Sequence, residues 1–298
     1  GHGGHDSGAV GSFSKEKNIN LNIALDFGKL VEQNCLDVKV IYTRKNDIFI
    51  PLNERADIAN RNKADLFISI HTNALPGGKI ARGSETYTLG MARAKENLDV
   101  AKRENSVILV EKNYKTNYSG FDPNSSESYI MFEFLQDKYM KQSIKLAECV
   151  QKQFRASGRP DKGVHQAGFL VLRCTSMPSA LVEVGYISTP DEERYLNTTE
   201  GIHTLAESIY KAFVQYKNSE GRLRHSDLTY SRDSTNEKSD TANQPEQESI
   251  PEKTSSLTEM QNRSNVSTTS DIQERKLSTK RTSNRIRMEN SIDTSIVR

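Results

Sequence analysis

Cysteine is scarce in this sequence, and tryptophan is missing altogether. The three cysteines, Cys35, Cys149 and Cys174, lie far apart, show no CxxC spacing and are odd in number. This pattern argues against a disulfide framework and against a cysteine zinc site. We interpret all three as buried, small apolar residues. The alternative is that Cys174 is a catalytic nucleophile, but no local signature supports it.

The sequence also lacks long apolar runs and an excess of charge. No run reaches the roughly 18 to 20 apolar residues needed to cross a bilayer, and no signal peptide is visible, although the chain starts inside what looks like a motif. The net charge of +2 is too small to predict binding to nucleic acid or to a membrane surface. The class of partner must therefore be inferred from a site.

The hydrophobic fraction of 35% is low for a fully packed chain of 298 residues. From about residue 219 the composition shifts to Ser, Thr, Asn, Glu and Lys. This shift predicts a folded domain at 1–218 and an unfolded tail at 219–298. The end of the tail, 275–298, is basic and could contact anionic polymers, but a solvated tail without a partner is the simpler interpretation.

Before that boundary, short apolar runs alternate with amphipathic segments. The pattern predicts strands at five places, namely 37–44, 64–70, 84–89, 169–172 and 179–184. Apolar residues recur at helical spacing in three others, around 23–31, 144–154 and 202–213. This alternation predicts an α/β fold with an open, twisted, mostly parallel sheet flanked by helices. The charge-rich segment 91–139 fits least well, and we interpret it as a helical insertion.

Two histidines and one glutamate are the candidate metal ligands. His2 stands in Gly1-His2-Gly3-Gly4, where glycines let the main chain come close to an ion. Glu16 opens the first expected helix, and His71 closes an apolar strand, where ligand sites of α/β sheets collect. Three such ligands leave a fourth position for water, as in catalytic zinc sites. The spacing does not prove that they converge, so a helix-dipole role for Glu16 stays open.

A further carboxylate, Glu183, lies in the otherwise apolar run 180–185. A buried carboxylate is costly unless it is paired, protonated or functional. Beside a metal ion, Glu183 would serve as a general base. A structural ion pair is the alternative interpretation.

Several motifs in order resemble one family. They are the opening His-Gly-Gly-x-Asp-x-Gly-Ala motif, Glu16, Tyr42-Thr43-Arg44 with Asp47, Leu52 and Arg55, the run 64–74 (ADLFISIHTNA) and the segment 183–188 (EVGYIS). Over residues 1 to about 216 they resemble the zinc-dependent N-acetylmuramoyl-L-alanine amidases of the AmiC type. Related enzymes carry a short apolar strand before the first motif, and we expect the sheet of this chain to lack that strand.

The resemblance implies one Zn²⁺ ion held by His2, Glu16 and His71, with Glu183 as the catalytic glutamate. It implies hydrolysis of peptidoglycan at the amide between N-acetylmuramic acid and the L-alanine of the stem peptide, by zinc-activated water with a glutamate general base. It also implies a periplasmic or cell-envelope location. Two alternatives remain: a non-catalytic module that binds cell wall, and a zinc peptidase acting within the stem peptide.

The insertion at 91–139 resembles the regulatory segment of division-associated members of this family, in which a helix covers the zinc cleft until a partner displaces it. The resemblance therefore implies an activator protein as a partner. Glu104 and Glu111 are the candidate carboxylates for blocking the open zinc position. The simpler interpretation is that both are solvated on a helix face.

Four residues are weaker candidates for substrate binding. Asn73 follows a predicted strand, and His165 lies in a segment that leads to one, so both could line the cleft. Arg44 and Arg55 could bind carboxylates of the stem peptide, although structural ion pairs are the simpler interpretation. We expect His5 to be exposed or to lie behind the ligands.

Overall fold

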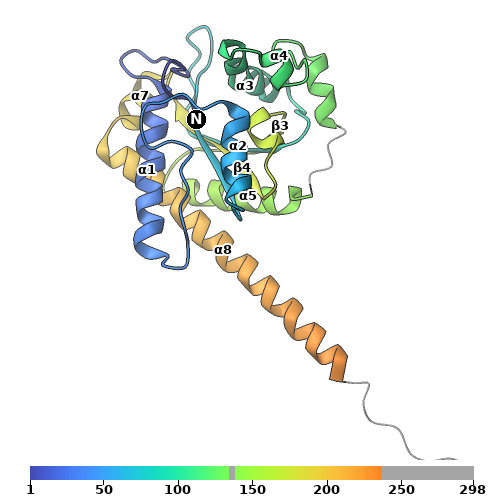
Figure 1. Ribbon diagram of the computed structural model, residues 1–298. Coiled ribbons are helices and arrows are strands. Elements are labelled where there is room, and N and C mark those ends of the chain that lie inside the picture. The colour runs from blue at the N-terminus through green and yellow to red at the C-terminus, as the bar shows by residue number, and fades with distance from the viewer. Residues whose placement is uncertain (134–137, 237–298) are drawn as a thin grey trace, which may run out of the picture. The chain divides into compact units, whose positions relative to one another are not determined.

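The computed structural model describes residues 1–133 and 138–236 (Figure 1). Within these residues one sheet forms, from β1 (Phe67–Asn73), β2 (Ser84–Leu89), β3 (Asp161–Ala167) and β4 (Ser179–Tyr186). The strand order is β1-β4-β2-β3. The β1–β4 and β2–β3 pairs are parallel, and the β2–β4 pair is antiparallel. The predicted α/β fold with a mostly parallel sheet is confirmed.

Helices pack on both faces of this sheet. They are α1 (Glu16–Asn34), α2 (Leu52–Arg61), α5 (Met140–Ala156), α6 (Leu170–Arg173), α7 (Pro190–Leu196) and α8 (Thr199–Asn236). On one face α1, α5 and α8 bury Ile70 and Val182, and Figure 1 shows α1 and α8 next to each other. On the other face α2, α6 and the insertion bury Leu181. Because side chains alternate along a strand, Glu183 shares the face of Leu181 and is directed toward the insertion.

The insertion contributes to the hydrophobic core in its described part. Its elements are α3 (Lys95–Asn105), the 3-10 turn η1 (Ser106–Val110), α4 (Tyr114–Asn117) and the 3-10 turn η2 (Glu127–Glu133), drawn in green in Figure 1. Ile108, Phe121 and Phe132 are buried in one cluster with Tyr87 and Phe169 of the sheet layer. The insertion is therefore a packed layer and not a loose loop.

Two predicted strands are wrong. Residues 37–44 form no strand, although the structure describes all of them, because a cavity of about 780 Å³ lies between them and β1. Without a neighbouring strand, their backbone has no ladder to join. Residues 169–172 lie mostly in the helical turn α6, and all are buried. A short, continuous apolar run has no periodicity by which a strand could be told from a buried helical turn.

Helix α8 spans the expected boundary at residue 218 and continues to Asn236, and the division into a folded domain at 1–218 and a tail at 219–298 stays a prediction. The ion pairs Lys217–Asp37 and Lys145–Glu220 hold α8 to the domain on either side of that boundary. The remainder of the predicted tail, 237–298, lies outside the described residues. In the described part, no helix is long and apolar enough to cross a membrane.

The cysteines are only partly as predicted. Cys149 is buried as expected, whereas Cys35 is half-buried and Cys174 is exposed. The interpretation as buried apolar residues is therefore wrong for Cys174, which lies at the end of α6 next to a surface turn.

Candidate metal centre

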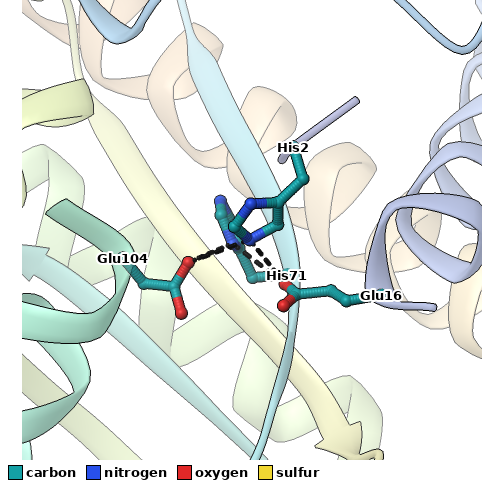
Figure 2. Close-up of side chains that lie close together, drawn as sticks. All are labelled: His2, Glu16, His71 and Glu104. Atoms are coloured by element: carbon teal, nitrogen blue, oxygen red, sulfur yellow. Dashed lines mark hydrogen bonds and ion pairs between the residues drawn. The ribbon is translucent and has the colours of Figure 1, made fainter. Parts of the chain in front are cut away.

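Four buried side chains meet on the face of the sheet that the insertion covers: His2, Glu16, His71 and Glu104 (Figure 2). Their possible ligand atoms all lie within 4.8 Å of one another. His2 Nε2 is 3.1 Å from both Glu16 Oε1 and Glu104 Oε2. His71 Nδ1 is 3.2 Å from Glu16 Oε1 and 2.9 Å from Glu104 Oε2. The structure thus brings together the three ligands expected from the sequence and adds Glu104.

His2 enters the site through an unusual backbone conformation. Its φ of 57° lies in the left-handed region, and Gly3 follows with a φ of 136°. A non-glycine residue there costs about 1–3 kcal/mol and persists only when its surroundings hold it. Arg55 donates to the His2 carbonyl at 2.8 Å, and Arg44 donates to the Gly1 carbonyl at 2.9 Å. The two arginines therefore support the strained segment that carries His2.

Glu16 is the first residue of α1, and its carboxylate is fixed on several sides. Oε1 accepts from the Thr72 amide at 2.9 Å and from Asn20 Nδ2 at 3.0 Å, and Oε2 accepts from the Ala9 amide at 2.8 Å. A Cβ atom at Gly8 would lie 2.6 Å from Glu16 Oε2, so only glycine fits this close approach. If Glu16 served only to interact with the helix dipole, its carboxylate would not need these hydrogen bonds, nor would it need to be buried at 1% exposure.

Each imidazole is held by a contact to its second ring nitrogen, the one that does not face Glu16 and Glu104. His2 Nδ1 lies 2.7 Å from Asp6 Oδ2, and His71 Nε2 lies 3.1 Å from Ser69 Oγ. Such hydrogen bonds hold a metal-binding histidine in one orientation and raise its basicity. Sequence reasoning missed Asp6, although its position four residues after His2 in the opening motif could have identified it.

The charges of the cluster suit a divalent cation. Burial lowers the pKa of His2, but the carboxylates of Glu16, Asp6 and Glu104 outweigh it and raise this pKa well above its usual value. Burial raises the pKa of Glu16, yet the nearby His2 and His71 lower it well below its usual value. A site that favours a positive imidazole beside two carboxylates also favours a metal ion. Imidazole nitrogens with a carboxylate oxygen are donors that zinc prefers.

Glu183 lies beside this cluster, in register with His71 on β1 and with Glu85 on β2. Its side chain is 1% exposed, and neither carboxylate oxygen has a hydrogen-bond partner among the described residues. Burial, followed by the charges of Glu104, Glu16 and Glu85, raises its pKa well above the usual value, although Arg103 lowers it. A buried carboxylate with a raised pKa is a candidate for proton transfer.

The weaker substrate-binding candidates take two different positions. Asn73 lies next to the cluster, where Nδ2 donates to Glu85 Oε1 at 2.5 Å. His165 Nε2 lies 3.6 Å from Glu85 Oε2, so it belongs to the same polar region. Arg44 and Arg55 donate to backbone carbonyls, as described above, and neither forms an ion pair among the described residues, so their contacts are structural but are not the ion pairs expected.

The two carboxylates that were candidates for blocking the zinc position lie in different places. Glu104 is 5% exposed and lies in the cluster. Glu111 accepts from Tyr118 Oη at 2.8 Å within the insertion. His5 is exposed and packs against Phe49 with ring centroids 4.2 Å apart. Only Glu104 is therefore placed to reach the two imidazoles.

Glu193 on α7 organises the loop that precedes Glu16, and sequence reasoning missed it. Its carboxylate accepts five hydrogen bonds of 2.8–2.9 Å from the amides of Ser12, Phe13 and Ser14 and from both serine hydroxyls. Burial raises its pKa, but these hydrogen bonds outweigh burial and lower the pKa to about 2. The partners lie about 180 residues away, so no local signal identifies this residue.

We expect Glu193→Gln to lower the free energy of unfolding by about 1–3 kcal/mol, because hydrogen bonds to a charged acceptor are lost. Urea unfolding at pH 7 measures this difference. Because the folded-state pKa is depressed, the contribution is present above the usual glutamate pKa and is lost as the pH falls toward about 2. The difference should therefore shrink at acidic pH. Asp191→Asn, an exposed change on the same helix, is the control; an equal loss there would contradict this role.

Comparison with known proteins agrees with this site. The chain matches the Amidase_3 family, described as N-acetylmuramoyl-L-alanine amidase, over residues 1–215. The N-acetylmuramoyl-L-alanine amidase AmiA of Escherichia coli (strain K12) is 32% identical over 220 residues, which are 72% of this chain and 73% of AmiA. AmiC of Escherichia coli O6:H1 is 35% identical over 223 residues, which are 72% of this chain and 51% of AmiC.

A solved structure gives the same result for the fold. The N-acetylmuramoyl-L-alanine amidase from Clostridium difficile 630 matches with a TM-score of 0.54 at 28% identity, over 74% of this chain and 94% of that chain. The sequence match covers the whole sheet and every residue of the candidate metal centre. This chain therefore belongs to the N-acetylmuramoyl-L-alanine amidase family.

Proposed function

We propose that this chain hydrolyses the amide between N-acetylmuramic acid and the L-alanine of the stem peptide in peptidoglycan, with the aid of one zinc ion. Family membership supports the reaction and the substrate. The observation that carries the proposal is the convergence of His2, Glu16 and His71 beside Glu183, whose carboxylate has no hydrogen bond among the described residues. These are the parts that hydrolysis of an unactivated amide requires.

Each residue has a role that follows from its position. His2 Nε2, His71 Nδ1 and the Glu16 carboxylate would hold the ion, and Asp6 keeps the His2 ring in place. When bound, zinc supplies a Lewis acid that polarises the substrate carbonyl and acidifies water. Glu183 takes the proton of the attacking water and delivers it to the departing amine of L-alanine. Its raised pKa suits both transfers because the carboxyl must accept a proton and then release it.

The insertion gives this site a second property, self-inhibition. Glu104 Oε2 lies 3.1 Å from His2 Nε2 and 2.9 Å from His71 Nδ1, so it would take the position that water and substrate need. This contact supports a closed state in which α3 covers the metal centre. An activator protein that moves α3 away would open it.

The substrate favours a periplasmic or cell-envelope location for the chain.

Analysis of the products tests the proposed reaction. Zinc-loaded protein should release intact stem peptides that begin with L-alanine from purified sacculi, and a chelator should stop the release until zinc is added back. Mass spectrometry identifies the peptides. Shortened peptides would indicate a peptidase instead, and bound zinc without any release would indicate a module that only binds cell wall.

A further inference from the structure

Arg103, which precedes Glu104 on α3, covers the other half of the site. Its Nη1 donates to the Ala74 carbonyl at 2.9 Å, and its Nη2 donates to Asn73 Oδ1 at 2.9 Å. The same Nη2 lies 3.8 Å from Glu183 Oε1. Glu104 thus faces the metal ligands while Arg103 faces the general base, so two consecutive residues cover different parts of the active site.

The acceptors that Arg103 contacts are fixed in place. Asn73 Nδ2 donates to the buried Glu85 carboxylate, which also accepts from Tyr186 Oη at 2.8 Å. The Asn73 amide therefore cannot rotate its oxygen away without losing this bond. The carboxylate of Glu183 is 1% exposed and has no hydrogen bond among the described residues. Buried acceptors without donors are costly, so a partner with N–H groups is expected to meet them when Arg103 moves away.

We propose that Ala74 O, Asn73 Oδ1 and the Glu183 carboxylate form the subsite for the N–H groups of the stem peptide, and that Arg103 inhibits by occupying it as a substrate mimic. The proposal rests on the proposed function, because Glu183 can protonate the departing amine only if that nitrogen lies beside it. A guanidinium presents several N–H donors in a plane and thus resembles a run of peptide N–H groups. The alternative is that Arg103 only anchors α3.

Measurements of peptide binding and of kinetics distinguish the substrate mimic from the anchor. In the Glu104→Ala background, we expect Arg103→Met to increase the affinity for a free stem peptide beginning with L-alanine by about tenfold or more, since one hydrogen-bonded competitor is removed. Calorimetry measures this affinity. On a soluble muramoyl-peptide, the same change should lower KM with little effect on kcat. Lys102→Met removes the neighbouring cation, which bonds Ser126, and serves as the control.

Two further measurements make the test decisive. Methylguanidinium should inhibit the double variant competitively, and Asn73→Ala in that variant should raise the peptide Kd by about tenfold, the loss of one hydrogen bond. Unchanged peptide affinity after Arg103→Met, or no competition by methylguanidinium, would overturn the subsite and leave Arg103 as an anchor. If peptide binding changes as expected while sacculi release no stem peptide, the subsite stands and the proposed reaction fails.

Discussion

Glu183→Gln is expected to retain zinc and fold normally but to lose turnover by about 10²–10⁴-fold, the range typical of a missing general acid–base group. The amide has nearly the same shape as the carboxyl group, but it cannot accept the proton of the attacking water. Stability should stay equal or rise, because the wild-type carboxylate is buried without a hydrogen bond among the described residues. The measurements are kcat on sacculi, zinc content and Tm.

The control for this substitution is Glu148→Gln, an exposed position on α5, which should leave kcat unchanged. If Glu183→Gln keeps a tenth or more of the wild-type turnover, the assignment of the general base is wrong. If the variant instead loses zinc or unfolds, Glu183 has a structural role, such as the ion-pair partner that the sequence left open.

Glu104→Ala is expected to raise turnover by about 5- to 150-fold, the range that 1–3 kcal/mol of coupling energy produces. The carboxylate lies within 3.1 Å of both inward-facing imidazole nitrogens, so its removal weakens the closed state while His2, Glu16 and His71 remain. Steady-state release of stem peptide measures the effect. Glu111→Ala is the matched control, because that carboxylate lies in the same insertion but bonds Tyr118. Equal turnover in Glu104→Ala and wild type would contradict self-inhibition.

A point substitution tests self-inhibition better than deletion of the insertion. Ile108, Phe121 and Phe132 are buried against Tyr87 and Phe169, so deletion would expose the core under them. Burial of one such side chain is worth about 1.5–3 kcal/mol. A deletion variant that failed to fold would say nothing about regulation, whereas Glu104→Ala leaves this packing in place.

The sequence predicted the class of fold and named most of the residues that meet in the candidate site, because those features have local signals. Apolar runs of strand length identified β1, β2 and β4, and helical spacing identified α1, α5 and α8. His71 and Glu183 were recognisable because each is an ionisable residue in an apolar strand. Their registered pairing on β1 and β4 explains how they come together, and only the structure shows that pairing.

The parts of the fold and of the candidate site that the sequence did not predict depend on contacts between distant residues. Residues 37–44 have the alternation of a strand, but a strand also needs a neighbour, and the cavity beside β1 takes that place. Arg103 lies in a charge-rich helix, where its pattern does not differ from that of a solvated face. Glu193 is identified only by the loop it binds, and that loop lies at the other end of the domain sequence.

A crystal structure of the zinc-loaded Glu104→Ala variant, with anomalous scattering recorded across the zinc absorption edge, tests the central claim most directly. We expect one zinc peak, about 2 Å from His2 Nε2, His71 Nδ1 and a Glu16 oxygen, as zinc–ligand distances require. A peak that lacks any of these three ligands, or that lies elsewhere in the chain, would contradict a metal centre formed by these residues.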